Sequence, residues 1–182
     1  SLIPGVQSGK FDMIIAGMSP TAERREKIDF SDNYFTSNLV IVKKAENLKD
    51  VKTIADVDGK KIAAQSGTFH LAALSEQTKA AANEMSDFTT MLIALKAGTI
   101  EGYVAEEPTA MAVCMDKAYD YIPFVNNGTG FKVDDDEVSI AVGVKKNNTE
   151  LKDKINGVLK DFGTDAQKEL MASMVAIAPV EE

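Results

Sequence analysis

The chain has 182 residues, of which 45% are hydrophobic and 26% charged, as in an ordinary soluble globular protein. Its formal net charge is -8 and its lysines and arginines form no cluster, so nucleic acid and an anionic membrane surface are not expected partners. Cys114 is the only cysteine, which excludes an internal disulfide, a paired-cysteine redox centre and a thiolate zinc cluster. A small ligand or another protein remains as partner.

Short apolar runs between polar turns predict strands along most of the chain. In chain order, they cover residues 13–16, 39–43, 61–65, 102–105, 122–125 and 139–144. The first run is continuously apolar, so we expect it to be buried on both faces. Helical periodicity between these runs predicts a helix ending near Gly9, one carrying Leu71 and Leu74, and helices over 87–97, 107–117, 149–162 and 165–174. The alternation predicts a mostly parallel α/β sheet.

The clearest helix is the one over 87–97. Its apolar residues fall at i, i+3, i+4 and i+7, namely Phe88, Met91, Leu92 and Leu95. We expect Ser86 to cap its start and Gly98 to end it.

Two polar passages, 34–38 and 132–138, separate well-patterned blocks and are the expected domain boundaries. Because the chain would pass from one lobe to the other at both places, one lobe is expected to be inserted into the sequence of the other. We therefore expect a first lobe that begins with residues 1–36, an inserted second lobe over 37–136, and a return to the first lobe over 137–182.

A glycine, a hydroxyl and an arginine follow the first predicted strand at short spacing. Gly17 lets backbone amides approach an anion closely, and Ser19 supplies a hydroxyl. The helix expected from Thr21 onward would point its unpaired N–H groups and positive dipole end at the same place. Arg24 adds a planar guanidinium that can hold a carboxylate by two parallel hydrogen bonds. These residue types predict a site for a free carboxylate.

The same segment resembles the signature of bacterial solute-binding proteins for polar amino acids, the extracytoplasmic receptors of ABC importers. The residues that carry the resemblance are Ser8-Gly9-Lys10-Phe11-Asp12, Ala16-Gly17-Met18, Thr21, Glu23-Arg24, Asp29-Phe30-Ser31 and Tyr34, with further matches over 59–68, 95–108 and 140–143. The resemblance implies an α/β fold of the type II periplasmic-binding-protein kind, with two lobes joined by a two-strand hinge. It also implies that the first lobe is incomplete, because family members carry a strand, a helix and a strand before the point where this chain begins.

The resemblance assigns Gly17, Ser19 and Arg24 to the binding of the ligand's carboxylate. Thr21 is expected to hold the turn or to make a neighbouring contact. The residues alone leave an alternative open, in which Arg24 forms a surface ion pair with Glu23 or Asp29.

For the ligand's ammonium, the resemblance points to Glu106, at a position where the family usually carries Asp. Glu107 is expected to point elsewhere and to cap the helix that Pro108 starts. Solvated glutamates at helix starts are common, so the alternative that Glu106 is a solvent-exposed residue without a ligand contact stays open.

A second turn, after the strand over 61–65, is implied to face the first one. The resemblance assigns ligand contacts there to Gln65, Gly67 and Thr68. Phe69 would cover the aliphatic part of a ligand, although an aromatic residue after such a turn is more often core packing.

Nothing in the sequence indicates an enzyme, a cofactor or a metal. The lone histidine, His70, has no nucleophile motif or metal-ligand spacing beside it and is expected to be a partly exposed helix residue. The acidic run over 134–137 lacks the spacing and the central glycine of a calcium loop.

The resulting prediction is an extracytoplasmic receptor, periplasmic or lipid-anchored at the outer face of the membrane, that captures a polar or basic amino acid by hinge closure and delivers it to an ABC transporter permease. A cyclohexadienyl-dehydratase-like enzyme and a ligand-sensing module of a receptor are the alternatives. Unpaired strand edges in an incomplete first lobe also predict that the fragment forms a homodimer.

Overall fold

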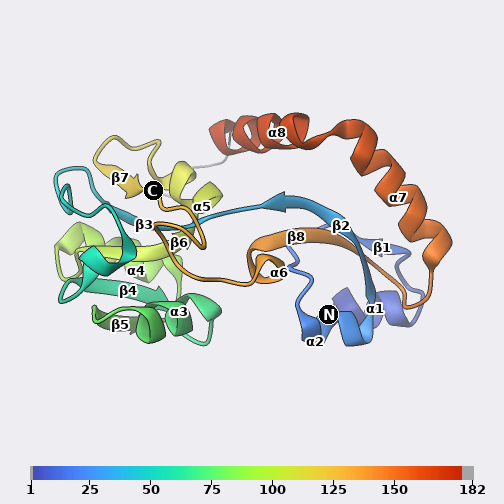
Figure 1. Ribbon diagram of the computed structural model, residues 1–182, viewed down its shortest axis with the longest axis horizontal. Coiled ribbons are helices and arrows are strands. Elements are labelled where there is room, and N and C mark those ends of the chain that lie inside the picture. The colour runs from blue at the N-terminus through green and yellow to red at the C-terminus, as the bar shows by residue number, and fades with distance from the viewer. Residues whose placement is uncertain (1, 178–182) are drawn as a thin grey trace. The chain divides into compact units, whose positions relative to one another are not determined.

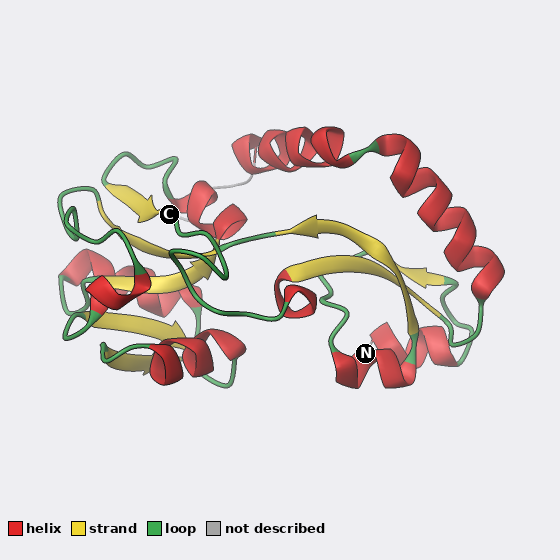
Figure 2. Ribbon diagram, in the orientation of Figure 1, coloured by secondary structure: helices red, strands yellow, loops and turns green. Residues whose placement is uncertain are grey.

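Two separate β-sheets organise the chain in this computed structural model, which describes residues 2–177 (Figure 1). The chain divides into two units around these sheets. The first unit contains residues 2–36 and 134–173, and the second contains residues 37–133 and 174–177. Both units combine helices and strands, as Figure 2 shows. Within the described residues, no helix has the length and apolar character needed to cross a membrane.

The sheet of the first unit has three strands, all antiparallel, in the order β1-β8-β2. These are β1 (Met13–Ile14), β2 (Asp29–Thr36) and β8 (Ser139–Val144). The helices of this unit are α1 (Leu2–Gln7), α2 (Ala22–Lys27), α6 (Asp135–Val138), α7 (Thr149–Phe162) and α8 (Thr164–Ile177), of which residues 174–177 belong to the second unit. The periodicity did not reveal β2, because this strand lies at an edge of its sheet and carries mostly polar residues.

A small apolar cluster holds the first unit together. Its buried members are Val6, Ile14, Ile28, Phe30 and Ala141. A Cβ at Gly143 would lie 2.9 Å from the buried Ile28 side chain, so a larger residue at this position would require Ile28 to shift.

The expectation that the first apolar run is buried on both faces is wrong. Ile14 is buried, whereas Met13 on the other side of the strand is 41% exposed and Ile15, the residue after the strand, is 69% exposed. The reason is that β1 is an edge strand of a small sheet, and its outer side borders a groove of about 340 Å³ beside α7. The residues that line this apolar groove are Met13, Ile15, Tyr34, Val142, Lys154, Ile155, Val158 and Leu159.

The sheet of the second unit has five strands in the order β5-β4-β6-β3-β7. In chain order, these are β3 (Leu39–Lys44), β4 (Lys61–Gln65), β5 (Ala81–Met85), β6 (Gly102–Glu106) and β7 (Tyr119–Ile122). The helices are a 3-10 turn (Ile54–Val57), α3 (Phe69–Gln77), α4 (Phe88–Ala97) and α5 (Glu107–Val113). Only the β5-β4-β6 part is parallel, since β3 runs antiparallel to β6 and β7.

The prediction of a mostly parallel sheet is therefore wrong. Crossover helices α3 and α4 connect the three parallel strands, as parallel pairing requires. Strand periodicity identifies strands but does not reveal their direction. β5 was missed because its sequence, AANEM, is largely exposed at a sheet edge.

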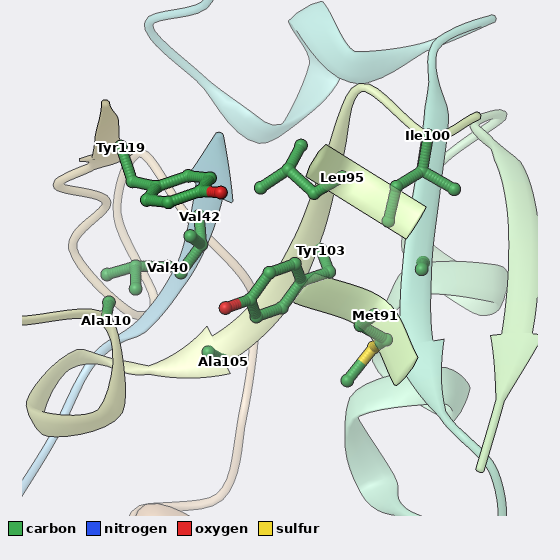
Figure 3. Packing of buried hydrophobic residues seen from close by; sticks show 10 residues of the cluster. Val40, Val42, Met91, Leu95, Ile100, Tyr103, Ala105, Ala110 and Tyr119 are labelled. Carbon is green, nitrogen blue, oxygen red and sulfur yellow. The ribbon is translucent and has the colours of Figure 1, made fainter. Parts of the chain in front are cut away.

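The core of the second unit packs α4 and α5 on this sheet. Figure 3 shows Tyr103 of β6 among side chains from α4 and β3, with Met91, Leu95 and Val42 close by. Tyr103 is almost fully buried. This core fixes the carboxyl end of β6, where Glu106 stands.

The cap predicted for α4 is wrong by one residue. The Asp87 side chain, not that of Ser86, accepts the hydrogen bond from the Thr90 backbone N–H, over 2.7 Å. A carboxylate is a stronger acceptor at a helix start than a hydroxyl, and the Ser86 hydroxyl instead donates to Asp87. Gly98 ends the helix with φ 75°, as predicted.

Candidate ligand-binding site

The turn between β1 and α2 leaves its backbone accessible. Gly17 is exposed and Ser19 is half-buried. Beyond its chain neighbours, no described atom lies within 4 Å of the position that a Cβ on Gly17 would take. Met18 N–H donates to the Ala16 carbonyl over 2.7 Å, and Tyr34 of β2 donates its hydroxyl to the same carbonyl over 3.2 Å. Tyr34 therefore holds this turn, a role that the sequence did not reveal.

Arg24 lies on α2 with its guanidinium against this turn. Its Nη1 donates to the Ser19 carbonyl over 2.9 Å, which leaves the other guanidinium N–H groups available. Within residues 2–177, Arg24 takes part in no ion pair. Glu23 instead pairs with Lys27 at 2.5 Å, and Asp29 pairs with Lys146 at 2.9 Å, so the alternative of a surface pair with either carboxylate is wrong.

Thr21 occupies the N-cap position of α2 through its backbone. Its side chain makes no capping hydrogen bond, while its carbonyl accepts from Arg25 N–H over 2.9 Å. Because α2 has six residues, its dipole adds little to anion binding, and the guanidinium and the turn are the features that fit a carboxylate.

In the second unit, the turn after β4 is organised by its own side chains. Thr68 donates its hydroxyl to the Gln65 carbonyl over 2.7 Å, and the Gln65 side chain donates to the Ser86 carbonyl over 3.3 Å. Gly67 has φ 67°, a left-handed conformation that favours glycine. The hydroxyl proton of Thr68 is thus used within the turn, and a direct ligand contact by Gln65, Gly67 or Thr68 stays a prediction.

Glu106 ends β6 with a half-buried side chain. The hydrogen bonds of the described residues include none to its carboxylate, which does not cap α5 either. Burial raises the pKa of Glu106, since water no longer stabilises its charge fully. Glu107 differs, because its carboxylate accepts from Asn38 over 3.3 Å and from Tyr121 over 3.4 Å.

The structure corrects the expectation for His70. This residue is 6% exposed, and burial lowers its pKa to about 4. Phe69, which is half-buried, contacts it with the two rings tilted by 56° and their centroids 4.4 Å apart. Phe69 therefore contacts the edge of the core, and its prediction as a ligand cover stays open.

Topology explains which predicted residues come together. β4 and β6 are parallel neighbours, so their carboxyl ends lie at the same edge of the sheet. Gln65 ends β4 and Glu106 ends β6, and ligands of open α/β sheets commonly bind at such an edge. Gly17, Ser19 and Arg24 form a separate cluster in the first unit.

Comparison with known proteins places the chain in a family. The profile of the bacterial extracellular solute-binding proteins, family 3, matches residues 1–173. The chain belongs to this family. Its α/β fold is accordingly that of the type II periplasmic binding proteins.

Relatives and solved structures agree with this assignment. A probable histidine-binding protein of Campylobacter jejuni is 37% identical over 109 residues, which are 60% of this chain and 42% of that protein. The arginine-binding extracellular protein ArtP of Bacillus subtilis is 26% identical over 93% of this chain and 64% of its own length. The chain thus spans less than two thirds of either relative.

An ancestral cationic amino acid solute-binding protein, AncCDT-1, has a similar structure, with a TM-score of 0.77 and 28% identity over 94% of this chain and 72% of that chain. Another structure of AncCDT-1, described as a precursor of cyclohexadienyl dehydratase, has a TM-score of 0.66 and 26% identity over 94% of this chain and 71% of that chain.

Proposed function

We propose that the protein is the substrate-binding receptor of an amino-acid ABC importer and binds a polar or basic amino acid. The observation that carries this proposal is the guanidinium of Arg24, which is held beside an accessible turn by one backbone carbonyl and is paired with no carboxylate among the described residues. A ligand carboxylate supplies the missing partner. Three similar proteins are named for binding histidine, arginine or cationic amino acids, and these names support a polar or basic amino acid as the ligand.

The second unit supplies a group for the other end of a zwitterion. The Glu106 carboxylate accepts no hydrogen bond from the described residues, and an ammonium group would satisfy it. Arg24 in the first unit and Glu106 in the second therefore each suit one of the two charged groups that every free amino acid carries. We place the protein outside the cytoplasm, where the receptor of an importer meets its ligand and its permease.

Isothermal titration calorimetry of the protein against the twenty amino acids tests this function. We expect binding of one or a few polar or basic amino acids, with no binding of simple carboxylic acids that lack an ammonium group. Failure of every amino acid to bind would refute the proposal.

An enzyme on the same scaffold is the second candidate. The raised pKa of Glu106 suits a general acid, and AncCDT-1 is described as a dehydratase precursor. We expect binding without turnover. Formation of aromatic products from prephenate or arogenate, followed by absorbance, would favour the enzyme instead.

We also propose that a second copy of the chain covers the apolar groove. Val158 is 68% exposed on α7, and large exposed apolar surfaces commonly mark association sites. We expect Val158→Glu to shift the protein from dimer to monomer in light scattering with size separation. Ile93→Glu is the matched control, because Ile93 is 62% exposed on a helix of the other unit and lies outside the groove. A wild-type monomer at high concentration would contradict the proposal.

A further inference from the structure

Two polar groups without partners face each other inside the second unit. His70 on α3 and Glu106 at the end of β6 are separated by 3.9 Å between Nε2 and Oε1. Neither ring nitrogen of His70 has a hydrogen-bond partner among residues 2–177. We infer that His70 is a positioning residue for Glu106, with its Nε2–H donating a hydrogen bond to the Glu106 carboxylate.

The rings in contact with His70 are aromatic and apolar. Its ring lies 4.4 Å from that of Phe69 and 6.3 Å from that of Phe88, and Phe88 lies 6.4 Å from Tyr103. In such an apolar site, an N–H group without an acceptor is unfavourable, because it has lost its hydrogen bond to water. Closing the gap to hydrogen-bond length needs a shift of roughly 1 Å, which the flexible and partly exposed Glu106 side chain can make.

Other charged groups near α3 do not replace Glu106 as the partner. The strands packed on α3 are β4, β5 and β6. Lys61 of β4 is exposed, and Glu84 of β5 accepts the Ser66 hydroxyl. Asp87 at the start of α4 accepts from Ser86 and Thr90.

The remaining charged residues on α3 and α4 are Glu76 and Lys96. Glu76 of α3 is exposed, and Lys96 lies in the last turn of α4, whereas Phe88, which contacts His70, lies in the first. Neither is in an ion pair with His70. Glu106 is therefore the one charged group that the described residues place within ion-pair distance of His70.

This arrangement gives His70 a defined chemical role. Because burial lowers its pKa to about 4, the imidazole is neutral at pH 7 and donates through a single nitrogen. A hydrogen bond from Nε2–H stabilises the ionised form of Glu106 and opposes the effect of burial on that carboxyl. His70 thereby keeps Glu106 anionic and oriented for a cation. That this cation is the ammonium of an amino acid rests on the proposed function.

The pairing itself can be tested without any ligand. His70 is the only histidine, so the ring signals in a ¹H–¹⁵N spectrum of histidine-labelled protein are unambiguous. We expect the proton on Nε2 and an upfield shift of that proton in Glu106→Gln, because a bond to a charged acceptor is the stronger one. Glu107→Gln is the matched control and should leave the signal in place. A proton on Nδ1, or the same signal in wild type and Glu106→Gln, would overturn the inference.

A second experiment measures the consequence for binding. His70→Leu removes the donor, and we expect about tenfold or greater loss of amino-acid affinity, whereas His70→Gln retains an N–H donor and should restore most of it. In His70→Leu, the pKa of Glu106 should rise further, so affinity should begin to fall at a higher pH on acidification. Equal affinity and equal pH profiles in His70→Leu and wild type would contradict the inference.

The two experiments separate the possible failures. If wild-type protein binds no amino acid but Glu106→Gln shifts the His70 signal, the pairing stands and the proposed function fails. If amino acids bind but the His70 ring signal is the same in wild type and Glu106→Gln, the function stands and this inference fails. Leucine is apolar, as are the aromatic rings in contact with His70, so we expect the His70→Leu protein to fold.

Discussion

Arg24→Gln is expected to weaken amino-acid binding by about 100-fold or more, because truncating one partner of a hydrogen-bonded charge pair typically loses several kcal/mol. Glutamine keeps a donor but has neither the charge nor the planar fork that binds a carboxylate through two hydrogen bonds. Titration calorimetry at neutral pH with the best amino-acid ligand measures the loss. Arg24→Lys should fall between wild type and Arg24→Gln, since lysine keeps only the charge.

The neighbouring arginine supplies a matched control. Arg25 lies on the same helix, but its guanidinium already binds both oxygens of Asp136, at 3.0 and 3.1 Å. We therefore expect Arg25→Gln to bind amino acids within about twofold of wild type, as is usual for a residue outside a binding site. If Arg24→Gln and Arg25→Gln bind equally well, the carboxylate site has been placed wrongly.

Glu106→Gln should have the second large effect, again about a 100-fold loss of affinity, because the ligand's ammonium loses its anionic partner. Its unfolding free energy should not decrease, since the substitution removes a partly buried charge that no cationic side chain neutralises among the described residues. Loss of affinity together with retained stability would separate a binding role from a structural one. Calorimetry and thermal unfolding of the same samples measure both quantities.

The pH dependence of binding carries an independent signature of Glu106. Burial raises its pKa, and only the ionised carboxylate attracts ammonium, so wild-type affinity should be complete well above that pKa and should fall as the pH drops through it. Glu106→Gln should lose this dependence. Glu107→Gln should keep both the affinity and the pH profile, because the Glu107 carboxylate is already bound by Asn38 and Tyr121. A pH profile that Glu106→Gln leaves unchanged would rule out this role.

Elements with strong local patterns were predictable from the sequence. Helix α7 has the bounds that its apolar stripe predicted, 149–162, and β4 and β8 also agree with the apolar runs. The strands β2 and β5 were not predictable, because edge strands with polar and exposed residues lack the alternation that marks a half-buried strand. Whether strands are parallel was equally hidden, since it depends on which strands become neighbours.

The candidate site divides in the same way. Gly17, Ser19 and Arg24 lie close together along the chain, so the sequence alone is enough to predict a carboxylate site there. Glu106 and Glu107 are adjacent in sequence, so local pattern does not distinguish their roles. The structure does, because the Glu107 carboxylate accepts hydrogen bonds from Asn38 and Tyr121.

The sequence by itself determined the family, the helices with strong periodicity and the residue types suited to a zwitterion, because these depend on local order and composition. The tertiary structure alone decided that His70 is buried and faces Glu106. These two residues meet because β4 and β6 pair side by side and α3 packs on them, and such long-range neighbours leave no trace in local periodicity.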